Sequence, residues 1–362
     1  MLFPSVKLNS AISSHKPVFH GGLYSMSNQR NDILDFSSNV NPLGPSPEVL
    51  KTIRNQLETI QIYPDSESLE LRKNLQKYTK IPSSQIVVGN GATEIIYNFC
   101  KAFLSKKTPV LIPIPTFGEY EAAAKMADAK VEFYKTMDLK KNLDNFISKI
   151  PNNGCIFICN PNNPVGYLIS KHYLKKIIIA ANKKNTLVFL DECFIELVPN
   201  YNESIISFVK KYSNLFVLRS LTKSFGLAGI RIGYALGEKK QISILNKIKI
   251  PWNVSGISQH AASTALLVPN YLDKSKKIIE KESNYLKNKI SKLEGFECYD
   301  SVANFILIKS KLKSKHLQKK LLKKKILIRD CTSFHGLDEN HIRIAVKTRK
   351  ENQKLVQAME AL

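Results

Sequence analysis

Short, largely apolar runs alternate with longer helical segments through the middle of the chain. The runs VLIPIP, GCIFICN and LVFLD lie at 110–115, 154–160 and 187–191, and each has apolar residues at consecutive positions. A strand of this kind is buried on both faces, and helices between such strands indicate parallel pairing. The pattern predicts an α/β fold with a mostly parallel sheet, helices on both of its faces and ligands at the carboxyl ends of its strands.

Three of the expected strand ends carry side chains suited to an aromatic ligand. Phe117 can stack on a flat ring, and Asn163, in the NPNNPVG turn at 160–166, can donate to a phenolic oxygen. Asp191 closes its strand and can hold the proton of a pyridinium nitrogen, so that the ring accepts electrons from a substrate. The structural alternative for Asp191 is an ordinary helix N-cap after a strand.

A polar loop at 220–229 lies between two further apolar runs and contains Lys223. A polar loop on a buried scaffold is a common place for catalytic residues. Ser220, Thr222 and Arg231 are of the types that hold a phosphate. A lysine nucleophile must lose its proton, and burial beside positive charge lowers the pKa of an ammonium group. The loop therefore suits a lysine that bonds to a phosphorylated aldehyde cofactor. In so lysine-rich a chain, however, Lys223 taken alone is better explained as a solvated surface residue, so the other motifs must support this role.

The segment 86–104 reads as a strand, a glycine-containing turn and an apolar helix. Free N–H groups at the start of such a helix and the helix dipole bind phosphate. The turn includes Gly91, Ala92 and Thr93. Glycine-rich turns between strands and helices are common, so this motif is weak when taken alone.

The chain changes character beyond Pro251, where lysine- and leucine-rich helices are followed by three short apolar strands. This predicts three parts: an N-terminal arm with part of a small domain at 1–45, a large domain at 46–255, and a small α+β domain at 256–362. Arginine is scarce in this chain, and Arg329 and Arg343 lie among aliphatic residues, which makes them candidates for pairing with carboxylate or phosphate.

Polar residues near the N-terminus are further candidates for ligand contacts. His20 precedes a Gly–Gly turn, and Asn39 and Asn41 lie in a loop rich in asparagine and proline. Turn and loop structure alone would also explain all three residues.

The formal net charge of +24 permits two interpretations. One is nucleic-acid binding, and the other is a lysine-biased surface that draws anionic small molecules. The second is favoured, because the lysines are scattered and aromatic residues are not interleaved with them. The densest run, at 311–325, keeps leucines at helical spacing and reads as an amphipathic helix.

The remaining composition indicates a cytoplasmic globular protein without metal. The chain has 362 residues, of which 43% are hydrophobic. It contains no run of about 18 apolar residues, so a membrane span is not predicted. Its N-terminal sequence lacks the features of a secretory signal. The six cysteines do not have the spacing of a zinc site and are expected to be reduced core thiols.

Together these motifs resemble the fold-type I pyridoxal-phosphate (PLP) enzymes of the aspartate aminotransferase superfamily. The resemblance covers nearly the whole chain and implies a large domain with a mostly parallel seven-stranded sheet and a smaller α+β domain. It also implies a homodimer in which Tyr63 reaches the partner's site, a small phosphorylated amino acid as substrate, and no nucleic-acid or membrane partner. The supporting segments are HGG at 20–22, DFSSNVNPLGP at 35–45, YPD at 63–65, GNGATE at 89–94, NPNNPVG, DECFIEL at 191–197, SLTKSFGLAGIRIGY at 220–234, PWNVS at 251–255 and ILIRDCTSFHGL at 326–337.

By this resemblance, Lys223 bonds the cofactor aldehyde, Asp191 pairs with the ring nitrogen, Asn163 bonds the ring oxygen and Phe117 stacks on the ring. The implied phosphate-binding group is Gly91, Ala92, Thr93, Ser220, Thr222 and Arg231. The implied substrate-binding group is His20, Asn41, Asn163, Arg329 and Arg343.

Within the superfamily the motifs resemble threonine-phosphate decarboxylases, with histidinol-phosphate aminotransferases as the alternative. Phe194 stands where the aminotransferases usually have tyrosine, and the arm begins with His20-Gly-Gly. Arg329-Asp-Cys also differs from the more usual Arg-Pro. The implied reaction is decarboxylation of L-threonine O-3-phosphate to (R)-1-amino-2-propanol O-2-phosphate for cobalamin biosynthesis, and serine phosphate is an alternative substrate. A nucleic-acid-binding protein that retains the fold is the non-enzyme alternative.

Overall fold

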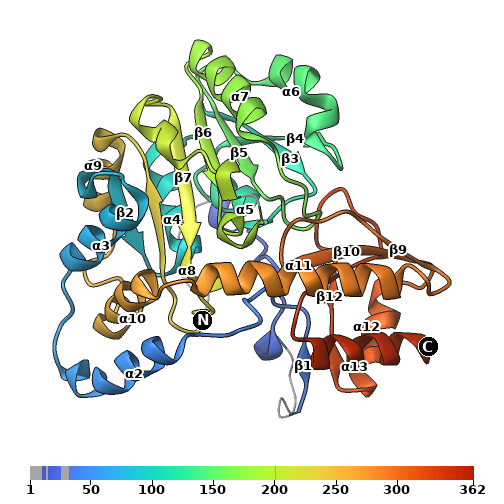
Figure 1. The fold of residues 1–362 in the computed structure, drawn as a ribbon. Helices are drawn as coiled ribbons and strands as arrows, with labels where there is room; N and C mark the ends of the chain where they lie inside the picture. The colour runs from blue at the N-terminus through green and yellow to red at the C-terminus, as the bar shows by residue number, and fades with distance from the viewer. Residues whose placement is uncertain (1–9, 14, 26–31, 200) are drawn as a thin grey trace, which may run out of the picture.

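The computed structural model describes residues 10–13, 15–25, 32–199 and 201–362. Its centre is a seven-stranded sheet with the strand order β2-β8-β7-β6-β5-β3-β4 (Figure 1). The strands β7, β6, β5, β3 and β4 are parallel to their neighbours in this order, whereas β8 is antiparallel to both β2 and β7. The predicted α/β fold with a mainly parallel sheet of seven strands is therefore confirmed.

The elements follow one another in the alternating order that the sequence indicates. The strands are β1 (Leu34–Asp35), β2 (Ile86–Gly89), β3 (Pro109–Ile114), β4 (Lys130–Lys135), β5 (Cys155–Cys159), β6 (Leu187–Asp191), β7 (Leu215–Ser220), β8 (Gly233–Leu236), β9 (Phe296–Cys298), β10 (Phe305–Ser310), β11 (Ile326–Leu327), β12 (Arg329–Asp330) and β13 (His341–Ala345). The helices are α1 (Ser10–Ser13), α2 (Pro47–Asn55), α3 (Leu69–Thr79), α4 (Gly91–Phe103), α5 (Glu119–Met126), α6 (Leu143–Lys149), α7 (Lys171–Lys183), α8 (Leu221–Ser224), α9 (Lys239–Ile248), α10 (Gly256–Leu267), α11 (Tyr271–Ile290), α12 (Ser314–Lys323) and α13 (Arg349–Glu360).

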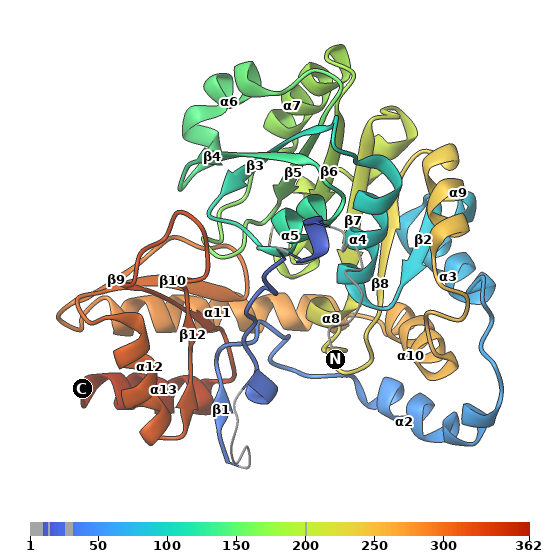
Figure 2. The ribbon, with the colours of Figure 1, turned by 180° about the vertical axis from the view of Figure 1, so that it is seen from behind.

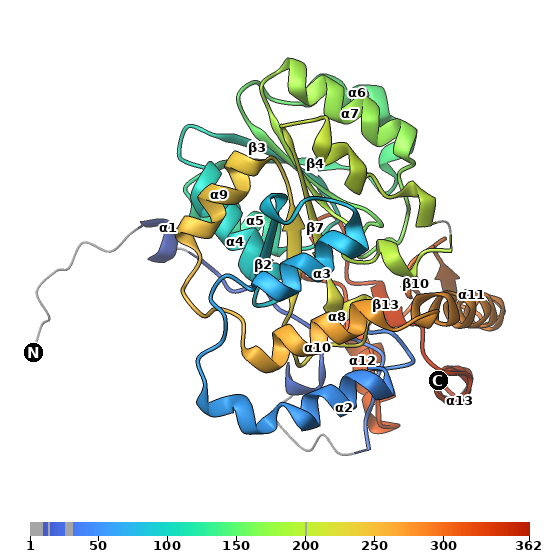
Figure 3. The same ribbon diagram turned by 60° about the vertical axis from the view of Figure 1, so that its left-hand side comes forward.

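Helices cover both faces of the large sheet, as Figure 3 shows. Successive strand residues point to opposite faces, so the apolar runs supply two separate cores. On one face, residues such as Ile156 and Val188 pack against α3, α6 and α7. On the other face, Phe157 and Phe189 pack against α4, α5 and α9. This burial on both sides explains why the strands are apolar at consecutive positions.

A smaller body is built from the C-terminal part of the chain around an antiparallel sheet of order β12-β13-β10-β9 (Figure 1). Its core includes apolar residues of α11, α12 and α13. Strand β1 pairs in parallel with β11, and Phe36 lies in the same core. Residues 34–36, which precede α2, therefore pack with the small body.

The position of α10 bears on the expected boundary at residue 256. This helix packs against α2 and α3, and its buried residues Ala261, Ala262 and Ala265 belong to the core of the large body. We therefore propose that the small domain begins near the start of α11. Helix α12 lies within the lysine-rich run at 311–325 and buries Leu317 and Leu321, as its amphipathic pattern predicts.

Side-chain hydrogen bonds hold the starts of α2 and α3. Ser46 is the N-cap of α2, and its hydroxyl accepts a hydrogen bond from the Val49 N–H group. Helix α3 begins at Leu69, after the N-cap residue Ser68. The Asp65 carboxylate accepts a hydrogen bond from the Leu69 N–H group at 2.6 Å, so it satisfies the first turn from outside the helix.

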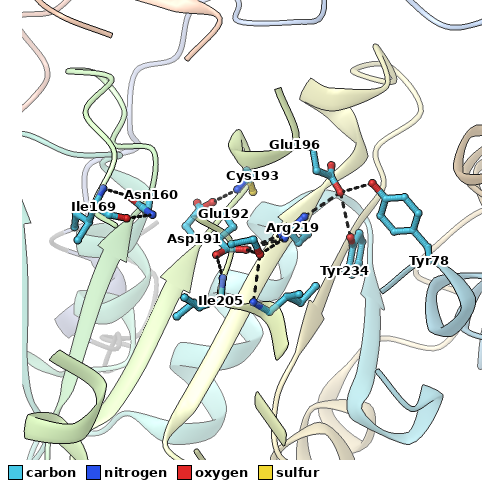
Figure 4. Close-up of polar contacts among 12 residues, drawn as sticks. Tyr78, Asn160, Ile169, Asp191, Glu192, Cys193, Glu196, Ile205, Arg219 and Tyr234 are labelled. Atoms are coloured by element: carbon cyan, nitrogen blue, oxygen red, sulfur yellow. Dashed lines mark hydrogen bonds and ion pairs between the residues drawn. The ribbon is translucent and has the colours of Figure 1, made fainter. Parts of the chain in front are cut away.

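A fully buried arginine, Arg219, joins the end of β7 to the segment after β6 (Figure 4). Its guanidinium group lies 2.8 Å from a Glu192 carboxylate oxygen and 3.0 Å from a Glu196 carboxylate oxygen. The hydroxyl of Ser204 accepts from Nη2 at 2.7 Å and donates to Glu192 at 2.8 Å. Tyr78, from α3, donates to Glu196 at 3.0 Å. These contacts hold together the two segments that carry Lys223 and Asp191.

Replacing Arg219 with methionine should destabilise the protein by about 3–5 kcal/mol, because two carboxylates would stay buried without their cation. The exposed Arg54, on α2, offers a matched Arg→Met control that should change the free energy of unfolding by less than about 0.5 kcal/mol. Chemical denaturation of both variants measures the difference. Equal stabilities would show that the buried network does not stabilise the fold.

Candidate active site

A cavity of about 310 Å³ opens where the carboxyl ends of the central strands meet the N-terminal arm and the small body. Cavities of this size hold small ligands and cofactors. The predicted site residues that line it are His20, Ala92, Thr93, Phe117, Asn163, Asp191, Ser220, Thr222, Lys223, Arg231, Arg329 and Arg343.

The order of the strands explains how residues distant in sequence meet in this cavity. Parallel strands end at the same edge of a sheet, so β5, β6 and β7 deliver their following residues to one place. Asp191 is the last residue of β6 and Ser220 the last of β7. The short helix α8 follows β7 directly and carries Lys223.

The Asp191 carboxylate is buried and lies in the cavity wall. One of its oxygens accepts from the Cys193 N–H group at 2.8 Å (Figure 4), and the other accepts from the Tyr120 hydroxyl at 2.5 Å. Burial raises the pKa of Asp191 above the ordinary aspartate range, and these hydrogen bonds oppose the rise. A cationic ring nitrogen beside it would stabilise the ionised form further.

Lys223 is only partly exposed, and its ammonium group lies 5.9 Å from the centre of the Phe194 ring. Burial lowers the pKa of Lys223 to about 8, and the positive charge of Arg343 acts in the same direction. Near physiological pH, a much larger fraction of Lys223 is therefore the neutral amine than of a solvated lysine. This is the property that an amine nucleophile requires.

Features expected to hold a phosphate lie together in the cavity wall. Ala92 and Thr93 are in the first turn of α4, where N–H groups are free and the helix dipole favours an anion. Arg231 faces this turn, and a Cβ atom at Gly91 would overlap its guanidinium group. Gly91 itself does not line the cavity, but its lack of a side chain leaves room for the guanidinium.

The backbone of Arg231 is in the left-handed region, with a φ of 57°. A non-glycine residue in that region is strained by about 1–3 kcal/mol, and such strain is concentrated at functional sites. The strain is consistent with selection for a guanidinium group at this position.

Arg329 and Arg343 are both buried, and their guanidinium carbons lie 5.5 and 5.9 Å from the centre of the Phe334 ring. Arg343 donates to the Asn163 side-chain oxygen and, at 2.9 Å, to the Ser37 carbonyl. Arg329 donates through Nη2 to the Phe19 carbonyl at 2.6 Å and to the Ser333 hydroxyl at 2.9 Å.

The two arginines both lack an anionic partner among the described residues. Among the described residues, neither has a carboxylate within ion-pair distance, and Nη1 of Arg329 is buried without a hydrogen-bond partner. Burial lowers the pKa of Arg343 to about 10, so both groups stay cationic at neutral pH. A buried cation without a counterion is costly, and an anionic ligand removes that cost.

The N-terminal arm forms part of the cavity wall and runs beside α5 (Figure 2). The exposed His20 lies 2.5 Å from a Glu119 carboxylate oxygen, and Tyr97 donates to the other oxygen at 2.6 Å. These hydrogen bonds hold the pKa of Glu119 below its ordinary value against the opposing effect of burial. The His20 ring is also 5.9 Å from the Phe117 ring.

Two other predicted site residues lie outside the cavity lining. The buried Asn41 side chain donates to the Ser224 carbonyl and the Ser275 hydroxyl and accepts from a backbone N–H group, so its position is that of a loop anchor. Tyr63 is 79% exposed and contacts Trp252, with ring centres 4.8 Å apart. Its predicted role at a partner's site stays a prediction.

Other cavity residues had a weaker signal in the sequence. Asn39 lines the cavity, and with its amide oxygen turned toward Arg343 it accepts from two guanidinium nitrogens at 3.2 and 3.3 Å. The loop sequence marked Asn39 as a candidate but could not separate it from Asn41. Tyr120, which contacts Asp191, was not indicated, because its helical position resembles that of any core tyrosine.

The residue chemistry of the cavity fits PLP. It provides an amine nucleophile, a carboxylate for a ring nitrogen, an aromatic wall and a cationic helix N-terminus for phosphate. Within the described ranges, His, Cys, Asp and Glu side chains do not form a group that could hold a metal ion, and no helix there is long and apolar enough to span a membrane.

Comparisons with known proteins agree with this chemistry. A sequence model of the family described as aminotransferase class I and II matches residues 31–359. A histidinol-phosphate aminotransferase of Methanococcus aeolicus is 35% identical over 339 residues, which cover 92% of this chain and 90% of that protein. A provisionally named threonine-phosphate decarboxylase of Caldanaerobacter subterraneus subsp. tengcongensis is 34% identical over 352 residues, covering 96% and 94%. The crystal structure of L-threonine-O-3-phosphate decarboxylase from Porphyromonas gingivalis has a TM-score of 0.82 at 28% identity, covering 91% of this chain and 99% of that one. This chain belongs to the class I and II aminotransferase family of PLP-dependent enzymes.

Proposed function

We propose that this protein decarboxylates L-threonine O-3-phosphate to (R)-1-amino-2-propanol O-2-phosphate, the reaction that its sequence motifs associate with cobalamin biosynthesis. The observation that carries the proposal is the pair Arg329 and Arg343, which face the cavity without a carboxylate partner among the described residues. Threonine phosphate brings two anionic groups, a carboxylate and a phosphate, and so satisfies both guanidinium groups. Histidinol phosphate brings only one.

The positions of the two arginines suggest which group each one binds. Arg343 is close enough to Lys223 to lower the pKa of that lysine, whereas Arg329 donates to the Phe19 carbonyl of the N-terminal arm. The carboxylate is bonded to the α-carbon beside the reacting amine, so we assign it to Arg343. The phosphate is on the β-carbon, so we assign it to Arg329, with His20 beside it at the arm.

Each residue of the site would then have a separate role. PLP supplies a ring that accepts the electron pair of the broken bond, and Asp191, Phe117 and Asn163 would hold that ring. Arg343 and Asn163 are hydrogen-bonded to each other, so the carboxylate would be clamped relative to the ring. With the carboxylate held there by Arg343, its bond to the α-carbon would break and CO₂ would leave. Lys223 would return a proton to the α-carbon, and the arm, which forms part of the cavity wall, would limit the access of water.

The second candidate is histidinol-phosphate aminotransferase. Relatives of both names match this chain with nearly equal identity. An aminotransferase could also use both arginines, because glutamate carries two carboxylates. The two reactions differ in which bond is held perpendicular to the ring, and about 1.4 kcal/mol of orientation energy changes their ratio tenfold.

The deciding experiment supplies PLP-loaded protein with carboxyl-labelled L-threonine O-3-phosphate and no keto acid. The proposal predicts labelled CO₂ over many turnovers, because decarboxylation regenerates the cofactor. A parallel reaction contains histidinol phosphate and 2-oxoglutarate. Glutamate formation there, with no CO₂ from threonine phosphate, would replace the proposal with the aminotransferase. A third reaction with serine phosphate measures how much the methyl group of threonine phosphate contributes to kcat/KM. We expect a contribution of about 1–3 kcal/mol.

Capture of PLP by the apoprotein should depend on the protonation of Lys223. Only the neutral amine attacks the aldehyde, so the capture rate should rise with pH and level off above about pH 8, the pKa of Lys223. Stopped-flow absorbance of PLP binding across pH 6 to 10 measures this. A rate that still rises tenfold per pH unit beyond about pH 9 would mean that the lysine has an ordinary pKa.

A further inference from the structure

The hydroxyl of Tyr120 is directed at Asp191 in the interior of the protein. The hydroxyl donates to Oδ2 of Asp191 at 2.5 Å, while the Cys193 N–H group donates to Oδ1 at 2.8 Å. Each carboxylate oxygen therefore has one donor from the protein, and the remaining capacity of the carboxylate is available to a cavity ligand. The two residues are 71 positions apart in sequence, and their hydrogen bond joins α5 to the last residue of β6.

The Tyr120 ring is held firmly by its surroundings. It is 1% exposed and stacks on Phe157 with centres 5.4 Å apart and an 18° angle between the planes. It also makes an edge contact with the Phe117 ring, with ring centres 5.6 Å apart and a 78° angle between the planes. Its position is thus fixed between the aromatic wall of the cavity and the core, and its hydroxyl cannot turn to another carboxylate without moving the ring.

We propose that Tyr120 is a positioning residue that acts on the cofactor through Asp191, by fixing the carboxylate as an ionised acceptor for the PLP ring nitrogen. This rests on the pairing of Asp191 with that nitrogen, which is part of the site proposed above. Burial and the charge of Asp191 raise the pKa of Tyr120, so the phenol keeps its proton and remains the donor. Its hydrogen bond opposes the effect of burial on Asp191, which would otherwise favour the neutral acid.

The test compares the affinity of apoprotein for PLP and for a carbocyclic analogue in which the ring nitrogen is replaced by C–H. Tyr120→Phe removes one oxygen atom and keeps the aromatic packing. Wild-type protein should prefer PLP, and Tyr120→Phe should reduce that preference by about tenfold or more, because a hydrogen bond to a charged group is lost. A general loosening of the cavity would weaken both ligands equally and leave the ratio unchanged.

Tyr78→Phe is the matched control, since Tyr78 also donates to a buried carboxylate, that of Glu196, at 3.0 Å. Tyr78 does not line the cavity, so this variant should keep the wild-type preference for PLP. An unchanged preference in Tyr120→Phe would overturn the proposal. No preference in the wild-type protein would overturn both the pairing of Asp191 with the ring nitrogen and the role of Tyr120.

A double-mutant cycle with Asp191→Asn distinguishes an effect of Tyr120 through Asp191 from an effect on folding alone. If Tyr120 acts through Asp191, then Tyr120→Phe should have little further effect on the preference in the Asp191→Asn background. A full effect in that background would also overturn the proposal. None of these measurements uses a substrate, so a failure here is distinguishable from a failure of the decarboxylase assignment, which the CO₂ assay tests.

Discussion

Lys223→Ala should lower turnover of threonine phosphate by about 10³-fold or more, because it removes both the covalent anchor of the cofactor and the group placed to move a proton at the α-carbon. The change should not unfold the protein, since the lysine lies at the cavity and has no carboxylate within ion-pair distance among the described residues. Steady-state CO₂ release measures the loss, and circular dichroism checks the fold.

Borohydride reduction gives a second and independent measure of the same prediction. Reduction should fix PLP to the peptide containing Lys223 in the wild-type protein, and mass spectrometry should find no label in the variant. Lys247→Ala, which removes an exposed lysine on α9, should retain both the label and the turnover. Label on a different lysine, or substantial turnover in Lys223→Ala, would contradict the assignment.

Arg329→Met should lower kcat/KM for threonine phosphate by about 100-fold or more, because the phosphate would lose a buried, charge-assisted partner. The same variant should hardly change kcat/KM for unphosphorylated threonine, which has nothing to place there. The ratio of the two substrates therefore isolates the contact between Arg329 and the phosphate. Kinetics of both substrates with wild-type and variant protein provide the measurement.

Arg343→Met is the companion variant, because its proposed partner, the carboxylate, is present in both substrates. It should lower kcat/KM for threonine phosphate and for threonine by similar factors. If Arg329→Met affected both substrates equally and Arg343→Met affected only the phosphorylated one, the assignments of the two arginines would have to be exchanged.

Much of the fold and of the cavity could be predicted from the sequence because the relevant signals are local. Consecutive apolar residues mark buried strands, and the residue that ends a parallel strand is delivered to a known edge of the sheet. Asp191 ends such a strand, and Asn163 and Lys223 lie shortly after the ends of two others, so their meeting in one cavity follows from the strand order.

The boundaries and the second layer of contacts were harder to predict. Helix α10 was expected in the small domain, but it packs on α2 and α3, and composition does not reveal which body a helix joins. Asn39 and Asn41 are two residues apart in one loop, yet Asn39 lines the cavity while Asn41 bonds to α11 and to the last residue of α8. The direction of a side chain in an irregular loop depends on what packs against it.

The sequence by itself determined the strand–helix alternation and the lysine and carboxylate at neighbouring strand ends, and its motifs carried the resemblance to a family. Only the tertiary structure decided that Tyr120 donates to Asp191, that Arg219 ties the segments of Lys223 and Asp191 together, and that Arg329 keeps a buried N–H group without a partner among the described residues. The physical reason is distance along the chain: a local pattern records which face of an element is buried. The hydrogen-bond partner of a buried polar group comes from another element and exists only once the two have packed.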